Sequence, residues 1–539
     1  NAGWQALLGH AYDSEGMPPY LPFTEALREY VVSATDAESG ALPPEVTALI
    51  PSLQIRVRHT KQGPHLDPAS ERYRSFDAIC SWFADLARKP GPCGLLLGIE
   101  DIHWADESTL LLLDHLARRL HEAPIVLVLT YRDTELVPGR PLARTIEQLA
   151  RLGITEGCNL RRFDATGVAM LLEALGGPNP PQRLVDAVYS ETEGNPLFVR
   201  EVYQYLTVAG RLFDEEGHWR RGFHIDEAEV PQGIQLVIGR RLQRLGEASR
   251  QALTVASVIG RAFDFELLRE VSGISEAALL GAMDEAAQAH LITGGQAANS
   301  DTHLLFTHEL VRQTLVSYLS PPHRRALHLA VAEANEKMHA ENLSPYAAEL
   351  AYHFRLSASA PAKTVEYSKR AAGAALEAFA WEEAARHLEG AIHTLDRIVG
   401  SDSERCDLLI ALIEALMPAG RWDQILSSTA PLAYELAESL RDQARMGAVA
   451  RTAVDALGQL AGAAGLTTAE GALWLERASA LTKTAQPSEI HACARADGGV
   501  RIVDDGEACR ANEYALDWNI RGEPGPAGDA GRHIRDLAE

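Results

Sequence analysis

The sequence predicts a mainly helical chain that begins with an α/β core and continues in helical domains. Two apolar runs, residues 95–99 and 125–130, alternate with helical stretches of about twelve residues, the pattern of βα units around a buried parallel sheet. The strand pattern fades after Phe163, and from His323 to about Thr484 only helical periodicity is found. Because single cores stop growing near about 300 residues, a chain of 539 residues is expected to form several domains.

Each helix is predicted by apolar residues three or four positions apart. The expected helices of the first part are 75–89, 108–121, a stretch through Leu142, Ile146 and Leu149, 164–175 and 181–210. Between residues 231 and 319 the sequence predicts several short helices followed by two short strands, 291–293 and 304–306. Such helices, with two strands joined by a polar, Gly-containing loop, are typical of a winged-helix unit.

The all-helical part contains a weak internal repeat. Trp381 and Trp422 open similar runs, and Ala391 and Leu432 occupy matching positions further along each run. Stacked helix pairs of this kind form a solenoid whose concave face binds partners. An irregular helical bundle is the alternative.

The composition limits the functions open to the chain. With 74 acidic and 50 basic residues the formal charge is −24, so the averaged field repels polyanions and gives no footprint for nucleic acid. Residues 239–244 carry three arginines and are the best candidate for a basic face. Three arginines on a helix are more often a solvated face, so DNA binding is not expected.

No segment predicts a membrane span or a secretion signal. No apolar run approaches the roughly 20 residues that cross a bilayer, and no basic-then-apolar segment follows Asn1. Cys80, Cys93, Cys158 and Cys406 stand apart without metal-ligand spacing, as ordinary thiols of a reducing compartment do. We therefore expect a cytoplasmic location.

The clearest chemical signal is a buried strand that ends in two acids. Residues 95–99 lead directly to Glu100 and Asp101, and His-Trp-Ala-Asp follows at 103–106. In α/β folds the carboxyl end of a strand is the edge where nucleotides bind. One carboxylate there can hold Mg²⁺, usually through water, while the other orients an attacking water. An acidic pair after a strand otherwise means only the start of a loop.

The next strand also ends in polar groups, Thr130 and Arg132. A hydroxyl and a guanidinium beside two acids can reach a γ-phosphate or the water that attacks it. The sequence has no Gly-x-x-x-x-Gly-Lys-Ser/Thr loop, and the glycines near Gly176 and Gly294 lack the lysine and the preceding strand. Because that loop supplies most of the grip on the phosphates, nucleotide affinity is expected to be poor.

Residues 95–106 resemble the Walker B motif of the STAND class of AAA-related ATPases, especially the large ATP-binding LuxR-type regulators and the cyclase-linked predicted ATPases. The resemblance implies a P-loop ATPase core that binds ATP or ADP with Mg²⁺. Glu100 and Asp101 would hold the metal, Asp101 and Arg132 would act in catalysis, and Thr130 would contact the nucleotide. A Glu in place of the more usual Asp at the first position leaves the division of labour between the acids open.

Two further motifs resemble nucleotide contacts of this class. Gly194 and Pro196 match the Gly-x-Pro motif at the base of the helical lid, although Gly-Asn-Pro is first a turn and proline a good helix start. His308 matches a winged-helix histidine that touches the ADP β-phosphate in related switch ATPases; a histidine at a strand-to-helix junction is more often structural. Residues 4–23 resemble the segment after the phosphate-binding loop, so the chain is expected to begin just after that loop.

Five domains are expected from these observations. They are a P-loop ATPase core lacking Walker A (1–160), a helical lid (161–222), a winged-helix domain (223–322), TPR-like helical repeats (323–484), and a short Cys-containing module with a collagen-like Gly-x-y tail (485–539). The last part resembles a module that precedes collagen-like repeats in some predicted bacterial surface proteins. Its Cys493 and Cys509 could pair only in an oxidising compartment, so a fused reading frame is an alternative.

The resemblance implies a bacterial signal-transduction switch that binds ATP. Its helical repeats would sense an inducer or a protein partner, with nucleotide-dependent self-association as a further interaction. Hydrolysis would be slow in the intact family, and weak or absent in this chain. The alternatives are a non-catalytic scaffold with an inactivated nucleotide site, or a surface protein led by the tail. Transcriptional regulators of this class end in a helix-turn-helix, which is not found at this C-terminus.

Overall fold

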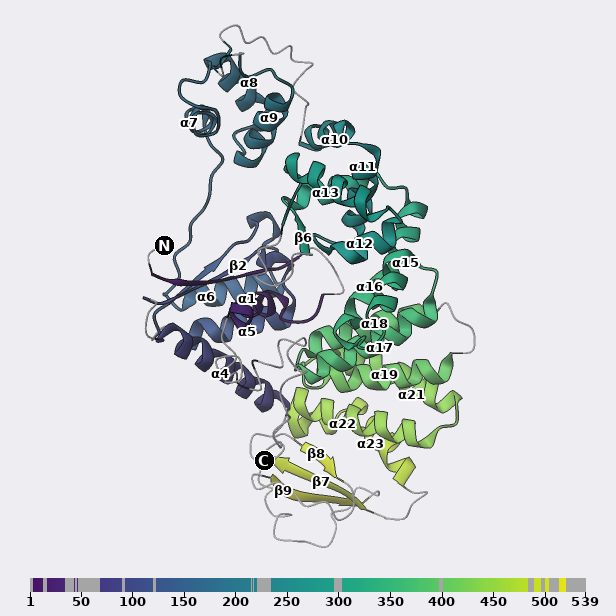
Figure 1. Ribbon diagram of the computed structural model, residues 1–539. Coiled ribbons are helices and arrows are strands. Elements are labelled where there is room, and N and C mark those ends of the chain that lie inside the picture. Colours follow the sequence, from purple (N-terminus) through teal and green to yellow (C-terminus); the bar gives the residue numbers. More distant parts are fainter. Residues whose placement is uncertain are drawn as a thin grey trace.

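The computed structural model has the shape of a curved stack of helices attached to a small α/β core (Figure 1). It describes residues 3–12, 17–33, 43, 46, 68–89, 93–119, 123–214, 216, 218–220, 234–294, 303–396, 401–482, 489–495, 500–503 and 513–519. Helices dominate these residues. The prediction of a mainly helical chain with an α/β beginning is therefore confirmed.

The core is built on a parallel sheet of three strands in the order β1-β2-β3. These are β1 (Gln5–His10), β2 (Leu95–Glu100) and β3 (Ile125–Leu129). Register aligns Gln5 with Leu95, and Leu95 with Ile125, so all three strands end at one edge. Strands β2 and β3 were predicted from their apolar runs. Strand β1 was not, because Gly9 and His10 interrupt its short apolar run.

Helices pack around this sheet and complete its core. They are α1 (Leu21–Ser33), α4 (Pro68–Ala87), α5 (Glu107–Arg119) and α6 (Pro141–Arg151). Leu97 and Ile99 of β2, Phe23 of α1 and Phe83 of α4 are fully buried there. Gly9 permits the close approach of α1, because a Cβ at this position would lie 1.8 Å from the carbonyl oxygen of Pro22. The backbone of α1 therefore lies directly against the backbone of β1 at Gly9.

The prediction that residues 125–130 form a buried strand is wrong for one of its faces. Val126 and Val128 are 44% and 43% exposed. Among the described residues β3 pairs with β2 alone and is an edge strand. An apolar run of five residues has the same composition whether one or both of its faces are covered, so the sequence could not make this distinction.

Three helices beyond the core form a small cluster of their own at the top of Figure 1. They are α7 (Ala165–Gly176), α8 (Gln182–Thr192) and α9 (Pro196–Val208). Val168, Val188 and Val199 are fully buried between them. The sequence predicted one helical stretch over 181–210; the structure divides it at residues 193–195, where Glu193 and Gly194 both have positive φ.

The next unit combines short helices with a second small sheet. Its helices are α10 (Ile234–Arg244), α11 (Glu247–Ile259), α12 (Phe265–Ser272), α13 (Glu276–Gln288) and α14 (Glu309–Ser317). Its strands are β4 (Ala262–Asp264), β5 (Ile292–Gly294) and β6 (His303–Phe306), antiparallel in the order β4-β6-β5. The helices and the β5–β6 pair follow the prediction. The third strand, β4, has only three residues and no pattern that would reveal it.

Helices alone follow in the described residues between 321 and 482, as predicted. They run along the right side of Figure 1 and pack in sequence order. The α-helices of four or more residues are α15 (Pro321–Met338), α16 (Ala347–Ser357), α17 (Pro361–Glu377), α18 (Trp381–Leu395), α19 (Asp402–Leu416), α21 (Ala430–Ser439), α22 (Gln443–Leu466) and α23 (Ala469–Thr482). Trp381 opens α18 and Trp422 opens the short helix α20 (Trp422–Gln424). The two tryptophans of the repeat therefore both begin helices.

The last described strands form a third sheet at the lower end of the stack (Figure 1). They are β7 (Glu489–Arg495), β8 (Val500–Val503) and β9 (Glu513–Asn519), antiparallel in the order β8-β7-β9. Residues 500–503, Val-Arg-Ile-Val, form the shortest of these strands. Cys509 and the Gly-x-y tail lie outside the described residues, as does the side chain of Cys493, so the pairing of the two cysteines stays a prediction.

Candidate functional site

The two acids lie side by side at the carboxyl end of the central strand. Glu100 is the last residue of β2, and Asp101 follows in the left-handed conformation with φ 56° and ψ 40°. Asp tolerates this conformation better than most residues but still at a cost. A single 3₁₀ turn, η2 (Ile102–Trp104), comes next, and α5 begins at Glu107. The backbone thus reverses sharply directly after the acids.

Thr130 holds this reversal in place from the neighbouring strand. The backbone N–H of Asp101 donates to the Thr130 hydroxyl at 3.0 Å, and the N–H of Ile102 donates to the Thr130 carbonyl at 2.9 Å. Arg132 lies over the ring of Trp104, with 5.0 Å from its guanidinium carbon to the ring centroid. The structure therefore brings Thr130 and Arg132, both predicted from their place after a strand, to the loop that carries the acids.

Three residues that the sequence did not single out form a chain of polar contacts that ends at Glu100. Nε2 of His10, the last residue of β1, lies 3.5 Å from Glu100 Oε2, and its Nδ1 lies 3.3 Å from Glu25 Oε2. Tyr12 donates its hydroxyl to Glu25 Oε1 at 2.7 Å. The hydrogen bond to Glu25 raises the pKa of His10, against the opposing effect of burial, and burial raises the pKa of the Tyr12 phenol.

These residues were not predicted as part of the site because strand β1 was not predicted. Once β1 pairs with β2, His10 stands opposite Glu100 in register. A polar residue at the end of an apolar run was the available signal, and His10 has it. Glu25 lies on α1 and has no pattern of its own, since its place beside His10 depends on how that helix packs.

The donors at this edge fit a small divalent cation. Mg²⁺ prefers oxygen ligands and commonly takes one or two carboxylates, completing its shell with water and phosphate oxygens. The side chains of Glu100 and Asp101 are 48% and 31% exposed, so both carboxylates are open to solvent. No cluster of three or more His, Cys, Asp or Glu side chains suited to a metal is found among the described residues. A metal would therefore depend on ligands beyond these side chains.

Gly194 and Pro196 lie in the cluster of α7–α9, which Figure 1 shows well apart from the sheet. Gly194 has φ 74°, and its carbonyl accepts from the N–H of Phe163 at 2.8 Å. Pro196 is the first residue of α9, capped by Asn195, whose side chain accepts from the N–H of Leu197 at 3.0 Å. The structure gives both residues a turn-forming and helix-starting role, and it does not bring them to the acids.

His308 lies between the two smaller units. It is the N-cap residue of α14, and its Nε2 lies 2.9 Å from the guanidinium of Arg200 on α9. Burial, followed by the charge of Arg200, lowers its pKa, so the ring accepts from Arg200 as a neutral imidazole. Arg261 connects this region with the core, because its guanidinium lies 5.9 Å from the centroid of the Tyr12 ring.

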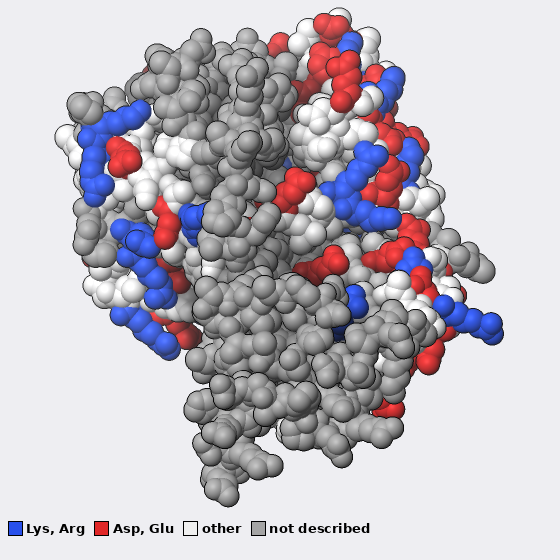
Figure 2. Space-filling model, turned by 90° about the horizontal axis from the view of Figure 1, so that it is seen from below, with Lys and Arg blue, Asp and Glu red and all other residues white. Residues whose placement is uncertain are grey.

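Two of the three arginines in the basic run 239–244 contact other parts of the protein. Arg241 is buried and donates to the carboxylate of Glu201 and to the carbonyl of Ala289. Arg244 lies over the ring of Tyr205. On the face drawn in Figure 2, blue and red side chains are interspersed over the described surface. In the parts of the chain that the structure describes, no helix is long and apolar enough to cross a bilayer.

Comparisons with known proteins give one family match and two similar proteins. Residues 1–129 match the family described as AAA ATPase domain. An uncharacterized protein of Rhizobium meliloti (strain 1021) is 26% identical over 305 residues, which cover 55% of this chain and 27% of that protein, so the chain corresponds to about a quarter of its relative's length. A crystal structure of a signal transduction ATPase with numerous domains (STAND), with a tetratricopeptide repeat sensor, from Pyrococcus horikoshii aligns over 90% of this chain and 72% of that chain, with 13% identity and a TM-score of 0.37.

Proposed function

Residues 1–129 match the AAA ATPase domain family, and from this premise we propose that the chain is a nucleotide-binding signal-transduction switch of the STAND class. The observation that carries the proposal is the set of polar groups at one sheet edge. Glu100 and Asp101 end the central strand, and Thr130 from the adjacent strand hydrogen-bonds to the backbone of Asp101. This is the edge at which α/β proteins bind nucleotides.

Each residue has a defined part in the proposal. Glu100 and Asp101 hold Mg²⁺, which would neutralise phosphate charge when bound, and Asp101 also orients the attacking water. Thr130 fixes the acid-bearing loop, and Arg132 supplies positive charge near the γ-phosphate. Gly194, Pro196 and His308 join the site only if their units move towards the core, as domain closure around a ligand would require.

The helical repeats are the proposed sensor for an inducer or a protein partner. Nucleotide and partner would then each favour one arrangement of core and repeats, which makes their affinities interdependent. The domain boundaries at 160, 222, 322 and 484 are part of this proposal. The second candidate is a scaffold without turnover, in which the core is inert and the helical repeats bind a partner.

The proposal is tested by titrating the chain with Mg²⁺-ADP and Mg²⁺-ATP in a calorimeter. Wild type is expected to bind weakly, and the Glu100→Gln/Asp101→Asn variant at least about tenfold more weakly, since each charge-assisted contact contributes about 1.5 kcal/mol or more. Glu147→Gln, an exposed carboxylate on α6, is the matched control and should bind as wild type does. Equal affinities in all three proteins would refute the nucleotide site and favour the scaffold.

A further inference from the structure

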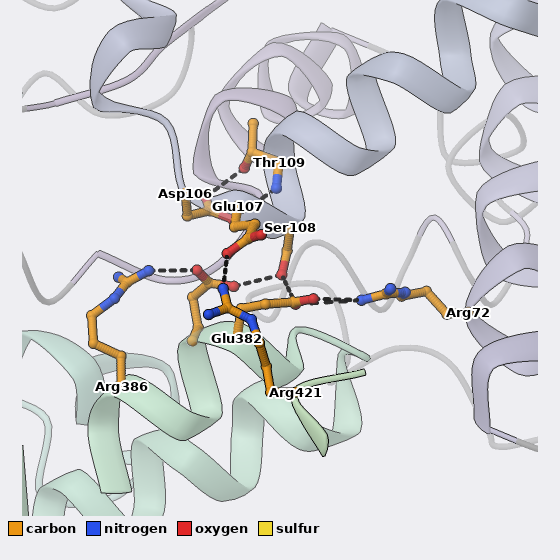
Figure 3. A network of polar contacts seen from close by, with 9 residues as sticks. Arg72, Asp106, Glu107, Ser108, Thr109, Glu382, Arg386 and Arg421 are labelled. Carbon is orange, nitrogen blue, oxygen red and sulfur yellow. Dashed lines mark hydrogen bonds and ion pairs between the residues drawn. The ribbon is translucent and has the colours of Figure 1, made fainter. Parts of the chain in front are cut away.

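The start of α5 and the start of α18 meet in a buried polar contact, although about 275 residues separate them. Ser108, the second residue of α5, is fully buried. Its hydroxyl lies 2.5 Å from Glu383 Oε2 and 3.1 Å from Glu382 Oε2, the two carboxylates that follow Trp381 in the first helical repeat. Figure 3 shows the carboxylates of the repeat directed at the first turn of the core helix.

Three arginines surround this contact. Arg72 of α4 pairs with Glu382 at 3.1 Å and stacks on Trp381, 4.2 Å from its ring centroid. Arg386 pairs with Glu383 at 2.7 Å. At the rim, Arg421 reaches Glu107, the first residue of α5, at 3.0 Å. Figure 3 labels the three arginines and marks their ion pairs with dashed lines.

Burial makes this contact more than a surface ion pair. Glu383 is 2% exposed, Trp381 3% and the side chain of Glu382 8%. Exposed ion pairs contribute little, whereas a buried carboxylate that loses a hydrogen-bond partner is destabilised strongly. Both side chains lie in the first turn of α18 and face the first turn of α5. The repeat therefore presents two buried, already positioned hydrogen-bond acceptors to the core helix.

A short loop connects this contact to the acid pair Glu100–Asp101. Residues 101–106 connect Asp101 to the cap of α5, where Asp106 accepts from the N–H of Thr109 at 2.8 Å and from its hydroxyl at 2.5 Å. One end of this loop is held by Thr130, and the other end enters the contact with the repeat. Asp101 is in the left-handed conformation, which persists in non-glycine residues only when the surroundings impose it.

We propose that Glu382 and Glu383 are positioning residues for the acid pair Glu100–Asp101, acting through Ser108 and the loop 101–106. The first helical repeat thereby fixes the geometry of the acids. A change in the contact between α18 and α5 alters the position of the acids, and a change at the acids alters that contact. The positioning role rests on the proposed nucleotide function, whereas the docking of α18 onto α5 does not depend on it.

Hydrogen exchange of the full chain tests the docking without any ligand. Ser108→Ala removes the donor from the core side and leaves the repeat intact, and Glu383→Gln keeps an acceptor for Ser108. Exchange of residues 101–110 should rise about five- to tenfold in Ser108→Ala, the effect of losing one or two hydrogen bonds, and stay within about twofold of wild type in Glu383→Gln.

Exchanging the charges of Arg421 and Glu107 at the rim of the contact provides a rescue experiment. Arg421→Glu should accelerate exchange of residues 101–110 by placing like charges together, and Glu107→Arg in the same chain should restore protection. Lys369→Glu is the matched control, because Lys369 pairs with Glu404 at 3.1 Å with similar exposure but within the repeats; it should leave residues 101–110 unchanged. Circular dichroism checks that each variant is folded.

Two outcomes overturn the inference. Wild-type exchange of residues 101–110 in both Ser108→Ala and Arg421→Glu would show that the repeat does not hold the loop. Mg²⁺-ADP affinity that is measurable in wild type and unchanged in Ser108→Ala would reject the positioning role. If wild type binds no Mg²⁺-ADP but the exchange pattern is as expected, the docking contact stands and the proposed function fails.

Discussion

Single residues in this chain carry backbone conformations that only particular side chains allow. Gly194 has φ 74°, and a Cβ there would lie 1.8 Å from the carbonyl oxygen of Phe163. Gly177 also has positive φ, 97°, but a Cβ there would meet nothing within 4 Å. The two glycines separate the cost of an unusual φ from the cost of steric overlap, because only Gly194 has both.

We therefore expect Gly194→Ala to be more destabilising than Gly177→Ala. The control should cost about 1 to 3 kcal/mol for its positive-φ backbone, and Gly194→Ala about 1 to 3 kcal/mol more for the overlap. Hydrogen exchange of residues 163–168 and 192–200 is the measurement. Equal exchange in both variants would mean that the turn relaxes away from Phe163 and that the tight approach is not required.

Elements are fixed by their ends as much as by their apolar faces. Asp264 is the last residue of β4 and the N-cap of α12, and its carboxylate accepts from the N–H groups of Glu266 and Leu267 at 2.7 and 3.2 Å. It thus satisfies two donors that a helix start leaves without partners. Glu285 of α13 acts in the same way on the start of α11, because its carboxylate accepts from the N–H of Gly246 and the hydroxyl of Ser249.

Removal of the cap at α12 should destabilise that helix by about 1 kcal/mol, the usual cost of replacing an N-cap Asp by Ala. Asp264→Ala is expected to accelerate exchange of residues 265–272, whereas Asp264→Asn keeps an acceptor oxygen and should remain close to wild type. The conservative variant would contradict the capping role if it lost protection to the same extent as the alanine variant.

At the scale of the whole molecule, buried titratable groups link the helical repeats to pH. His328 and His353 are buried with their Nδ1 atoms 2.9 Å apart, so one ring donates to the other and both are neutral. Burial lowers the pKa of His328 to about 4 and that of His353 to about 3. The half-buried carboxyl of Glu349 and the buried carboxyl of Glu383 have the opposite shift, with desolvation raising their pKa to about 7 and about 8.

The sign of the histidine effect follows from proton uptake. Below pH 6.5 the unfolded chain binds protons that the folded repeats exclude, so stability falls as the pH drops towards 4 and 3. At pH 5 each histidine should cost about 2 kcal/mol. His353→Gln keeps hydrogen-bonding groups without titrating, so it should reduce the loss of Tm between pH 7.5 and pH 5.0, followed by circular dichroism. The exposed His393→Gln is the control, and a His353→Gln loss equal to wild type would contradict the assignment.

The two carboxyls change the stability over a higher pH range, and there the stability falls as the pH rises. Their folded pKa values lie above the ordinary 4.5, so the stability they contribute is complete below pH 4.5 and is lost as the pH rises through about 7 to 8. Both proteins in the comparison contain them. The difference between wild type and His353→Gln therefore isolates the histidine contribution.

The sequence by itself determined the elements and the chemistry at their ends. The apolar runs that became β2 and β3, the acids Glu100 and Asp101, and the helix starts at Trp381 and Trp422 were all visible in it, because periodicity and turn-forming residues are local properties. The turn at Gly194 was visible for the same reason.

Only the tertiary structure decided which of these groups meet. It placed His10 opposite Glu100, joined Ser108 to Glu382 and Glu383, and left Gly194 and Pro196 away from the acids. Contacts across hundreds of residues depend on how whole elements pack, and no local pattern encodes them. The strand β1 and the exposed face of β3 belong to the same class, since the pairing and covering of a strand are properties of its neighbours.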